Sequence, residues 1–182
     1  IQDVLQPMRA LYLRMPAVAT LVLAVGAGYL IGGIRSALVV AALTLFIALS
    51  PWWDRALVTL YMATFGVVIS CLIGFTVGTL CFQNKKSAAF MLGVCDIFQT
   101  FPSFVYLIPV MMLFGITDTS VLIAVIVYAT IPATRYTIEG LRSVPVGLHE
   151  AATMSGVNKF QRLTKIEFPL AFPHMMLGLN QT

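Results

Sequence analysis

Apolar residues dominate this chain in long runs that short clusters of charged residues separate. When the sequence is cut at its charges, six runs emerge: residues 15–34, 36–53, 56–84, 97–117, 119–134 and 168–182. A helix needs about 20 mostly apolar residues to cross a bilayer, and several runs reach that length. The runs do not alternate in polarity as barrel strands would, and open strands would leave backbone groups unsatisfied in lipid. The pattern predicts an all-α integral membrane protein with about five complete helices and a truncated sixth.

The composition excludes the soluble classes. Hydrophobic residues make up 59% and charged residues 10% of the 182 residues, against roughly 45–50% and 25% in soluble domains. The chain opens at Ile1 instead of Met, and it stops within the sixth apolar run. We therefore expect residues 1–182 to be one transmembrane domain, present as a fragment that lacks its C-terminal helices.

The distribution of basic residues predicts how the chain is oriented. Eight Lys and Arg residues lie in the connections after the first, third and fifth runs, and three lie on the other side. Because cytoplasmic loops carry the excess of basic residues, we place the N-terminus outside and residues 135–167 in the cytoplasm. The chain has no basic stripe interleaved with aromatic residues, so the lipid bilayer is an expected partner and nucleic acid is not.

Local patterns within the runs predict how the helices pack and bend. The third run carries a small residue at every fourth position: Gly66, Ser70, Gly74 and Gly78. Such a stripe favours close packing within the bundle, with a dimer seam or a pore lining as alternatives. Pro109 and Pro132 should kink their helices. Residues 86–100 are amphipathic, and we expect them to lie along the cytoplasmic interface before the chain turns inward at Phe101-Pro102.

The cytoplasmic connection, residues 135–167, is long and polar enough to be functional. Pro145 suits the first turn of a helix, and one face of that helix carries small and apolar residues: Leu148, Ala151, Ala152 and Ser155. Gly156 would end this helix. Asn158 and Gln161 have the spacing of a capping box for a second helix, which Phe168-Pro169 would end. The pattern predicts two short helices at an angle, with an exposed small-residue face that docks into a groove of a partner.

These residues also carry a resemblance to a known family. Glu150-Ala151-Ala152, three residues, Gly156, nine residues, Ile166, one residue and Phe168-Pro169 resemble the "EAA" loop of permease subunits of ATP-binding-cassette (ABC) importers. The usual pattern has Leu where Phe168 stands. The resemblance implies the transmembrane domain of a type I ABC importer, in which residues 135–167 form the coupling loop. It implies a mechanical contact with the ATPase subunit, and no catalytic role, for Glu150, Ala151, Ala152, Gly156, Ile166 and Pro169.

A second resemblance concerns the solute. Residues 99–116, Val144-Pro145 and residues 178–182 resemble the glycine betaine/proline (quaternary amine) uptake permeases. The resemblance implies osmoprotective import of such a solute across a bacterial plasma (inner) membrane by alternating access. It also implies the partners: two cytoplasmic ABC ATPase subunits, an extracellular or periplasmic solute-binding protein or domain, and a second permease chain. The resemblance suggests that this second chain is identical, and a heterodimer is the alternative. A permease for methionine, taurine or nitrate, or a stand-alone carrier or channel, remains an alternative.

Other chemistry finds little support in the sequence. The chain has no Gly-x4-Gly-Lys-Ser/Thr phosphate loop, so we expect ATP and Mg²⁺ to be used by the partner, with no cofactor on this chain and no enzymatic activity of its own. The spacing of the three cysteines, Cys71, Cys81 and Cys95, does not indicate a metal site. The acids Asp54, Asp96 and Asp118 fall at the ends of runs, so a proton relay is not expected.

Aromatic residues provide the remaining candidates for contact with a solute. Trp52 and Trp53 are typical of an interfacial aromatic belt, which we favour over a cation–π cage. Tyr106 and Phe104, beside the expected kink at Pro109, are candidates for lining the translocation path. At helical spacing, however, such aromatic residues are also typical of core packing.

Overall fold

The computed structural model describes residues 2–182, with the side chains of residues 2–6, 8 and 149 left out of the description. Throughout this described range the regular secondary structure is helical, as predicted. The chain divides into two compact units, residues 1–64 and 65–182.

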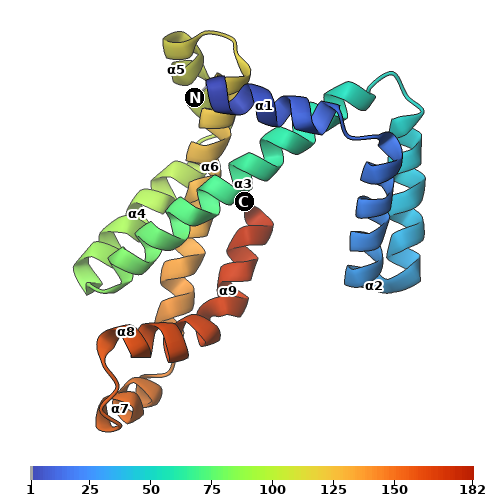
Figure 1. Ribbon diagram of the computed structural model, residues 1–182. Helices are drawn as coiled ribbons and strands as arrows, with labels where there is room; N and C mark the ends of the chain where they lie inside the picture. The colour runs from blue at the N-terminus through green and yellow to red at the C-terminus, as the bar shows by residue number, and fades with distance from the viewer. Residues whose placement is uncertain (1) are drawn as a thin grey trace. The chain divides into compact units, whose positions relative to one another are not determined.

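The first unit contains α1 (Gln2–Leu13), α2 (Ala17–Ala48) and the beginning of α3 (Trp53–Phe82). Figure 1 shows α2 as two antiparallel rods joined by a sharp reversal. The reversal lies at Gly32 and Gly33, and Gly33 has φ +67°, which L residues with a side chain rarely adopt. A Cβ on Gly28 would stand 3.0 Å from Cγ2 of Val40, so the two arms touch.

The α2 hairpin corrects the expectation for the first two apolar runs. They do form two separate helical rods, but the chain reverses at Gly32-Gly33 rather than at Arg35. A reversal needs a backbone conformation that glycine adopts readily, whereas a charge only marks where a residue prefers water. Each arm is consequently shorter than the about 20 residues that a complete crossing requires.

The second unit is built around α6 (Asp118–Arg142), which packs against α4 (Lys85–Thr100), α5 (Phe104–Phe114) and α9 (Phe168–Gln181). Helices α6 and α9 lie side by side along most of the length of α9 (Figure 1). Between them the chain forms α7 (Val146–Met154), α8 (Lys159–Arg162) and the π-helical turn η1 (Leu163–Glu167).

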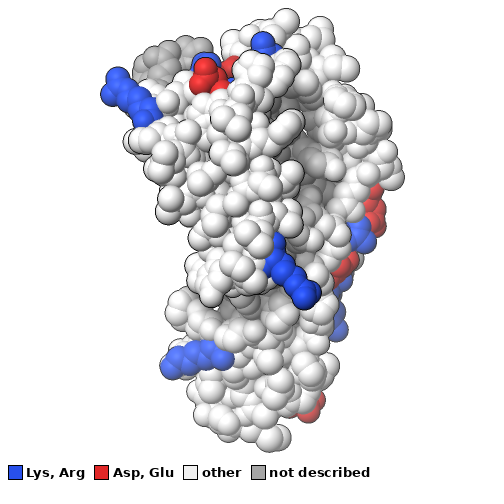
Figure 2. Space-filling view, turned by 90° about the vertical axis from the view of Figure 1, so that its right-hand side faces the viewer, with Lys and Arg blue, Asp and Glu red and all other residues white. Residues whose placement is uncertain are grey.

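The number of complete spans is lower than expected. Among the described residues, α3 and α6 are each long and apolar enough to cross a membrane, and α2 reaches that length only when its two arms are counted together. Helices α4 and α5 pass the same test as a pair bent by 88°, which is the geometry of a broken span or a re-entrant loop. The bend lies at residues 101–103, which confirms the predicted turn at Phe101-Pro102. Pro109 and Pro132 lie inside α5 and α6, each of which continues past its proline. Figure 2 shows a face on which uncharged residues predominate, as lipid contact requires.

The small-residue stripe of the third run packs against α6, which confirms the bundle-packing interpretation. Cβ atoms built on Gly66, Gly74 and Gly78 would stand 2.5–2.7 Å from side chains of α6. The fourth member, Ser70, is fully buried and donates a hydrogen bond from Oγ to the carbonyl oxygen of Ile126, at 3.2 Å. The small residues at these positions let the backbones of α3 and α6 approach each other closely.

Candidate functional site

The predicted coupling loop begins with a helix that ends at the expected glycine. Pro145 is the N-cap of α7, and Gly156 follows its C-cap with φ +73°. The Gly156 N–H bonds to the Thr153 carbonyl at 3.1 Å, and the Val157 N–H bonds to the Ala152 carbonyl at 3.2 Å. These two bonds form a Schellman motif, in which the left-handed residue is most often glycine. The prediction that Gly156 stops this helix is confirmed.

The predicted capping box of the second helix is also present. Asn158 Oδ1 accepts a hydrogen bond from the Gln161 N–H at 2.8 Å, and Gln161 Oε1 accepts one from the Asn158 N–H at 3.1 Å. Two backbone donors that would otherwise lack helical partners are thereby satisfied, and α8 begins at Lys159.

The expected end of the second helix is wrong. Phe168-Pro169 does not terminate it, because α8 continues through η1 directly into α9. The Phe168 N–H bonds to the Leu163 carbonyl, five residues back, so the ladder is already widened where the proline follows. Pro169 then lies in the first turn of α9, where a missing N–H is tolerated. The loop therefore enters α9 without a break in its helical backbone.

Four of the six predicted coupling residues line one groove. Ala151 and Ala152 of α7 face Ile166 of η1 and Pro169 of α9 across a shallow groove of about 530 Å³. Gly156 forms the turn that folds these segments together. Glu150 is exposed and lies outside the groove. The remaining lining residues are Leu148, Ser155, Val157, Lys165 and Leu170.

The small-residue face of α7 is turned partly inward, which corrects the expectation of a fully exposed knob. Ala152 is only 5% exposed, and it lines the groove that α7 shares with η1 and α9. The outward face of α7 carries Val146, Glu150 and Met154, all exposed, with Met154 at 90%. Sequence reasoning missed this outward face, although the i, i+4, i+8 spacing of the three residues was visible.

The outer limits of the loop also differ from residues 135–167. Residues 135–142 are the last turns of α6, where Ile138 and Leu141 are fully buried. The helix continues through Arg135, whose charge is paired: Nη1 donates to Asp96 Oδ1 at 2.6 Å and Nε donates to Glu139 Oε1 at 3.0 Å. Gln99 Oε1 accepts a further bond from Nη1 at 2.8 Å. A cut at the first charge therefore ends the helix too early.

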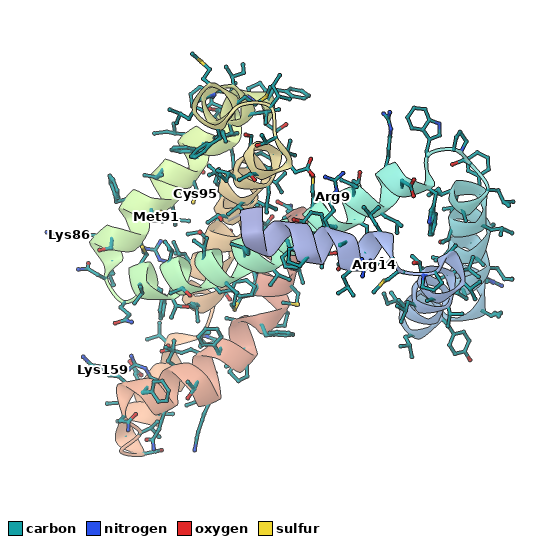
Figure 3. All side chains as sticks on the ribbon, turned by 45° about the horizontal axis from the view of Figure 1, so that its top comes forward. Arg9, Arg14, Lys86, Met91, Cys95 and Lys159 are labelled. Carbon is teal, nitrogen blue, oxygen red and sulfur yellow. The ribbon has the colours of Figure 1, made fainter. Side chains whose placement is uncertain are left out.

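The coupling loop and the connection between α3 and α4 lie at the same end of the second unit. Arg142 donates a hydrogen bond from Nη2 to the Lys85 carbonyl at 3.3 Å, and Phe82 and Gln83 line a cavity together with residues of α8 and η1. The predicted orientation needs both connections on one side of the membrane. Figure 3 shows Lys86 in the first turn of α4 and Lys159 in α8. It also shows Cys95, which is buried between α4 and α6.

The loop is anchored to the membrane helices by a small core. Leu141, Ala171 and Met175 of α6 and α9 form its buried centre, and four partly buried residues pack around it: Phe75, Phe82, Leu163 and Phe168. A glycine on each of the two helices lets α6 and α9 approach closely. A Cβ built on Gly140 of α6 would stand 2.9 Å from His174 Cβ, and a Cβ built on Gly178 of α9 would stand 2.8 Å from Tyr136 Cβ. Motion of the loop would therefore reach α3, α6 and α9 together.

The three candidates for the translocation path do not converge. The ring of Tyr106 lies between those of Phe98 and Tyr128, with centroid distances of 6.0 and 5.9 Å, and its hydroxyl donates to the Phe98 carbonyl. Phe104 and Pro109 are exposed, and Phe104 lies two residues from Tyr106 on α5, so the two point to different sides of the helix. Tyr106 thus joins α4, α5 and α6 at the bend. Sequence reasoning missed Phe98 and Tyr128.

The exposed tryptophan of the first unit has a basic neighbour. The guanidinium of Arg55 lies 4.9 Å from the centroid of the Trp52 ring. This cation–π contact occupies one face of the ring, so it argues further against a cage for a solute at this position.

Comparison with known proteins places these features in a family. A family model described as "Binding-protein-dependent transport system inner membrane component" matches residues 66–180. That range contains the small-residue stripe, the groove, and both ends of the coupling loop.

Three curated relatives resemble the chain over nearly its full length. The trimethylamine N-oxide transport system permease protein TmoV of Pelagibacter ubique is 88% identical over the whole chain, which spans 25% of that relative. TmoV of Ruegeria pomeroyi is 44% identical over 98% of the chain and 27% of its own length. The glycine betaine/proline betaine permease protein ProW of Escherichia coli is 32% identical over 98% of the chain and 51% of its length. The chain thus spans between a quarter and a half of these relatives.

Proposed function

The chain belongs to the family of binding-protein-dependent transport system inner membrane components, and from this premise we propose that it is part of the permease of an ABC importer for small methylated amines. Trimethylamine N-oxide is the first candidate solute and glycine betaine the second. The observation that carries this proposal is the 88% identity, over the whole chain, to a protein named as a trimethylamine N-oxide permease. Both solutes combine a trimethylated nitrogen with a nearby anionic oxygen, so one path could serve both.

The energy for transport comes from a separate cytoplasmic ATPase subunit that contacts the coupling loop. The outward face of α7, formed by Val146, Glu150 and Met154, offers two exposed apolar side chains around a carboxylate. The groove behind it joins α7 to η1 and α9. Closure of two ATPase subunits pulls on α7, and the anchored helices then open the path outward. The ATPase subunit binds ATP and Mg²⁺, and this chain needs no bound cofactor.

The assembly contains two identical permease chains and receives its solute from an extracellular or periplasmic binding protein or domain. Tyr106 is the candidate residue that the solute meets at the bend between α4 and α5, with Phe104 and Pro109 nearby on the same short helix. A broken span at this position is a common way to build a solute site within a membrane.

The proposal is tested by ATP hydrolysis in proteoliposomes that contain the whole protein, its ATPase and its binding protein. Trimethylamine N-oxide or glycine betaine should stimulate hydrolysis only when the binding protein is present. Stimulation by methionine, taurine or nitrate instead would reassign the solute. A complete lack of response to any solute, with no ATPase bound to the chain, would contradict the importer assignment.

A further inference from the structure

The π turn η1 (Leu163–Glu167) lies directly between the coupling loop and α9. A π turn holds one residue more than the corresponding α turn, and π turns are rare and frequent at functional sites. Removing the extra residue would rotate α7 and α8 by about 100° relative to α9, because an α-helix has 3.6 residues per turn. The turn therefore fixes the direction in which α7 and α8 project from α9.

An ion pair brackets this turn. Arg162 Nε donates to Glu167 Oε1 at 2.9 Å, and the two residues are five apart, which is the hydrogen-bond spacing of a π turn. In an α-helix the side chains that meet are three or four residues apart. The Glu167 side chain is only 3% exposed, whereas that of Arg162 is 32% exposed. A buried carboxylate depends strongly on its partners, so the pair favours the π register over the α register.

The π turn borders the groove of α7 on one side and a cavity at the end of α3 on the other. Lys165 and Ile166 line the groove that Ala151 and Ala152 share. Leu163 and Glu167, with Arg162, line a separate cavity of about 420 Å³ whose other walls include Phe82 and Gln83 at the end of α3. A change of register would move both sets of contacts at once.

We propose that Arg162 and Glu167 are positioning residues that hold η1 in its π register and thereby transmit movement of the coupling loop to α9 and α3. Without the pair, the segment relaxes toward an α-helical register and absorbs the pull on α7. This inference rests on the proposed function, since it assumes that an ATPase moves the loop. It adds a specific requirement that the family's EAA pattern does not contain.

The test uses the whole transporter in proteoliposomes and measures solute uptake per ATP hydrolysed. Three variants weaken the register: Glu167→Gln, Arg162→Gln and a deletion of the exposed Thr164. Thr164→Ala is the matched control, because it removes only the hydrogen bond from Thr164 Oγ1 to the Phe160 carbonyl. We expect uptake per ATP to fall about tenfold in the first three variants, in line with the coupling effects of residues between two sites, and to stay unchanged in the control.

The readouts separate this inference from its alternatives. A combined Glu167→Gln and Arg162→Gln variant should resemble each single variant, because the two residues act as one unit. ATPase binding and ATP hydrolysis should persist in the single substitutions, which excludes simple unfolding. Normal uptake per ATP in both single substitutions would overturn the inference, whatever the deletion does. Absence of ATP-dependent uptake in the unaltered protein would instead overturn the proposed function.

Discussion

Gly74 of α3 lies so close to Ala133 of α6 that a Cβ built on the glycine would stand 2.5 Å from the alanine Cβ. The backbone of α6 is equally near, since the Thr134 nitrogen would lie 2.9 Å from the same atom. A side chain at position 74 can therefore be accommodated only if the two helices separate. This contact makes α3 and α6 move together.

Replacing Gly74 should consequently destabilise the second unit. We expect Gly74→Val to lower the stability by about 1–3 kcal/mol, the usual range for overpacking, measured by thermal unfolding in detergent. Gly93→Ala is the matched control, because Gly93 lies in α4 with no neighbour within 4 Å of its added Cβ. Equal melting temperatures for both variants would show that α3 and α6 are not packed as described.

Replacing Gly156 should disturb the coupling loop without unfolding the protein. Gly156→Ala places a side chain at φ +73°, a conformation that disfavours L residues by about 1–2 kcal/mol. We expect reduced uptake per ATP with normal membrane insertion, and Gly156→Pro should uncouple hydrolysis from transport completely. Gly147→Ala is the control and should behave like the unaltered protein, because Gly147 lies within α7 and an added Cβ there would have no neighbour within 4 Å. Normal coupling in Gly156→Pro would contradict the role of this turn.

The outward face of α7 should determine how tightly the ATPase binds. Met154→Asp introduces a charge at a side chain that is 90% exposed in this chain, and we expect the Kd for the isolated ATPase subunit to rise about tenfold or more. Met154→Leu keeps the apolar contact and should bind normally. Titration of the ATPase against the permease in nanodiscs measures both. Unchanged binding in Met154→Asp would place the contact elsewhere on the loop.

Two ion pairs of similar length should differ in their contribution to stability. Arg135 and Asp96 are partly exposed, so Asp96→Asn should lower the stability by under about 1 kcal/mol. Arg162→Ala removes a guanidinium that contacts the buried Glu167 carboxylate, and loss of a partner from a buried pair should cost more, up to about 3 kcal/mol. Thermal unfolding of the two variants side by side checks the difference. A larger loss of stability in Asp96→Asn than in Arg162→Ala would contradict the statement that the buried pair contributes more.

Signals that act over a few residues were read correctly from the sequence. The capping box of Asn158 and Gln161 and the stop at Gly156 depend on local backbone chemistry, and both are present. The stripe that includes Gly66 and Gly78 predicted helix packing because four-residue spacing places small residues on one face. The turn at Phe101-Pro102 is present where the amphipathic segment 86–100 gives way to the next apolar run.

Features that depend on distant partners were not predictable in the same way. The cut at charged residues starts the loop at Arg135, and the sequence does not show that its partners Asp96 and Gln99 come from another helix. The continuation past Pro169 depends on the π turn, which has no simple sequence signature. The groove that Ala152 shares with Ile166 and Pro169 likewise depends on how the chain folds back after α7. For Arg135 and Ala152, the placement of distant segments overrides a valid local expectation.

Uptake of radiolabelled trimethylamine N-oxide is the most direct test of the central claim that this chain helps move methylated amines with energy from a separate ATPase. Proteoliposomes would hold the whole protein and its ATPase, with ATP enclosed and the binding protein outside. We predict uptake that requires enclosed ATP, that unlabelled glycine betaine inhibits and that methionine does not. Uptake that proceeds without ATP, or ATP-dependent uptake of methionine, taurine or nitrate with none of either methylated amine, would contradict the claim.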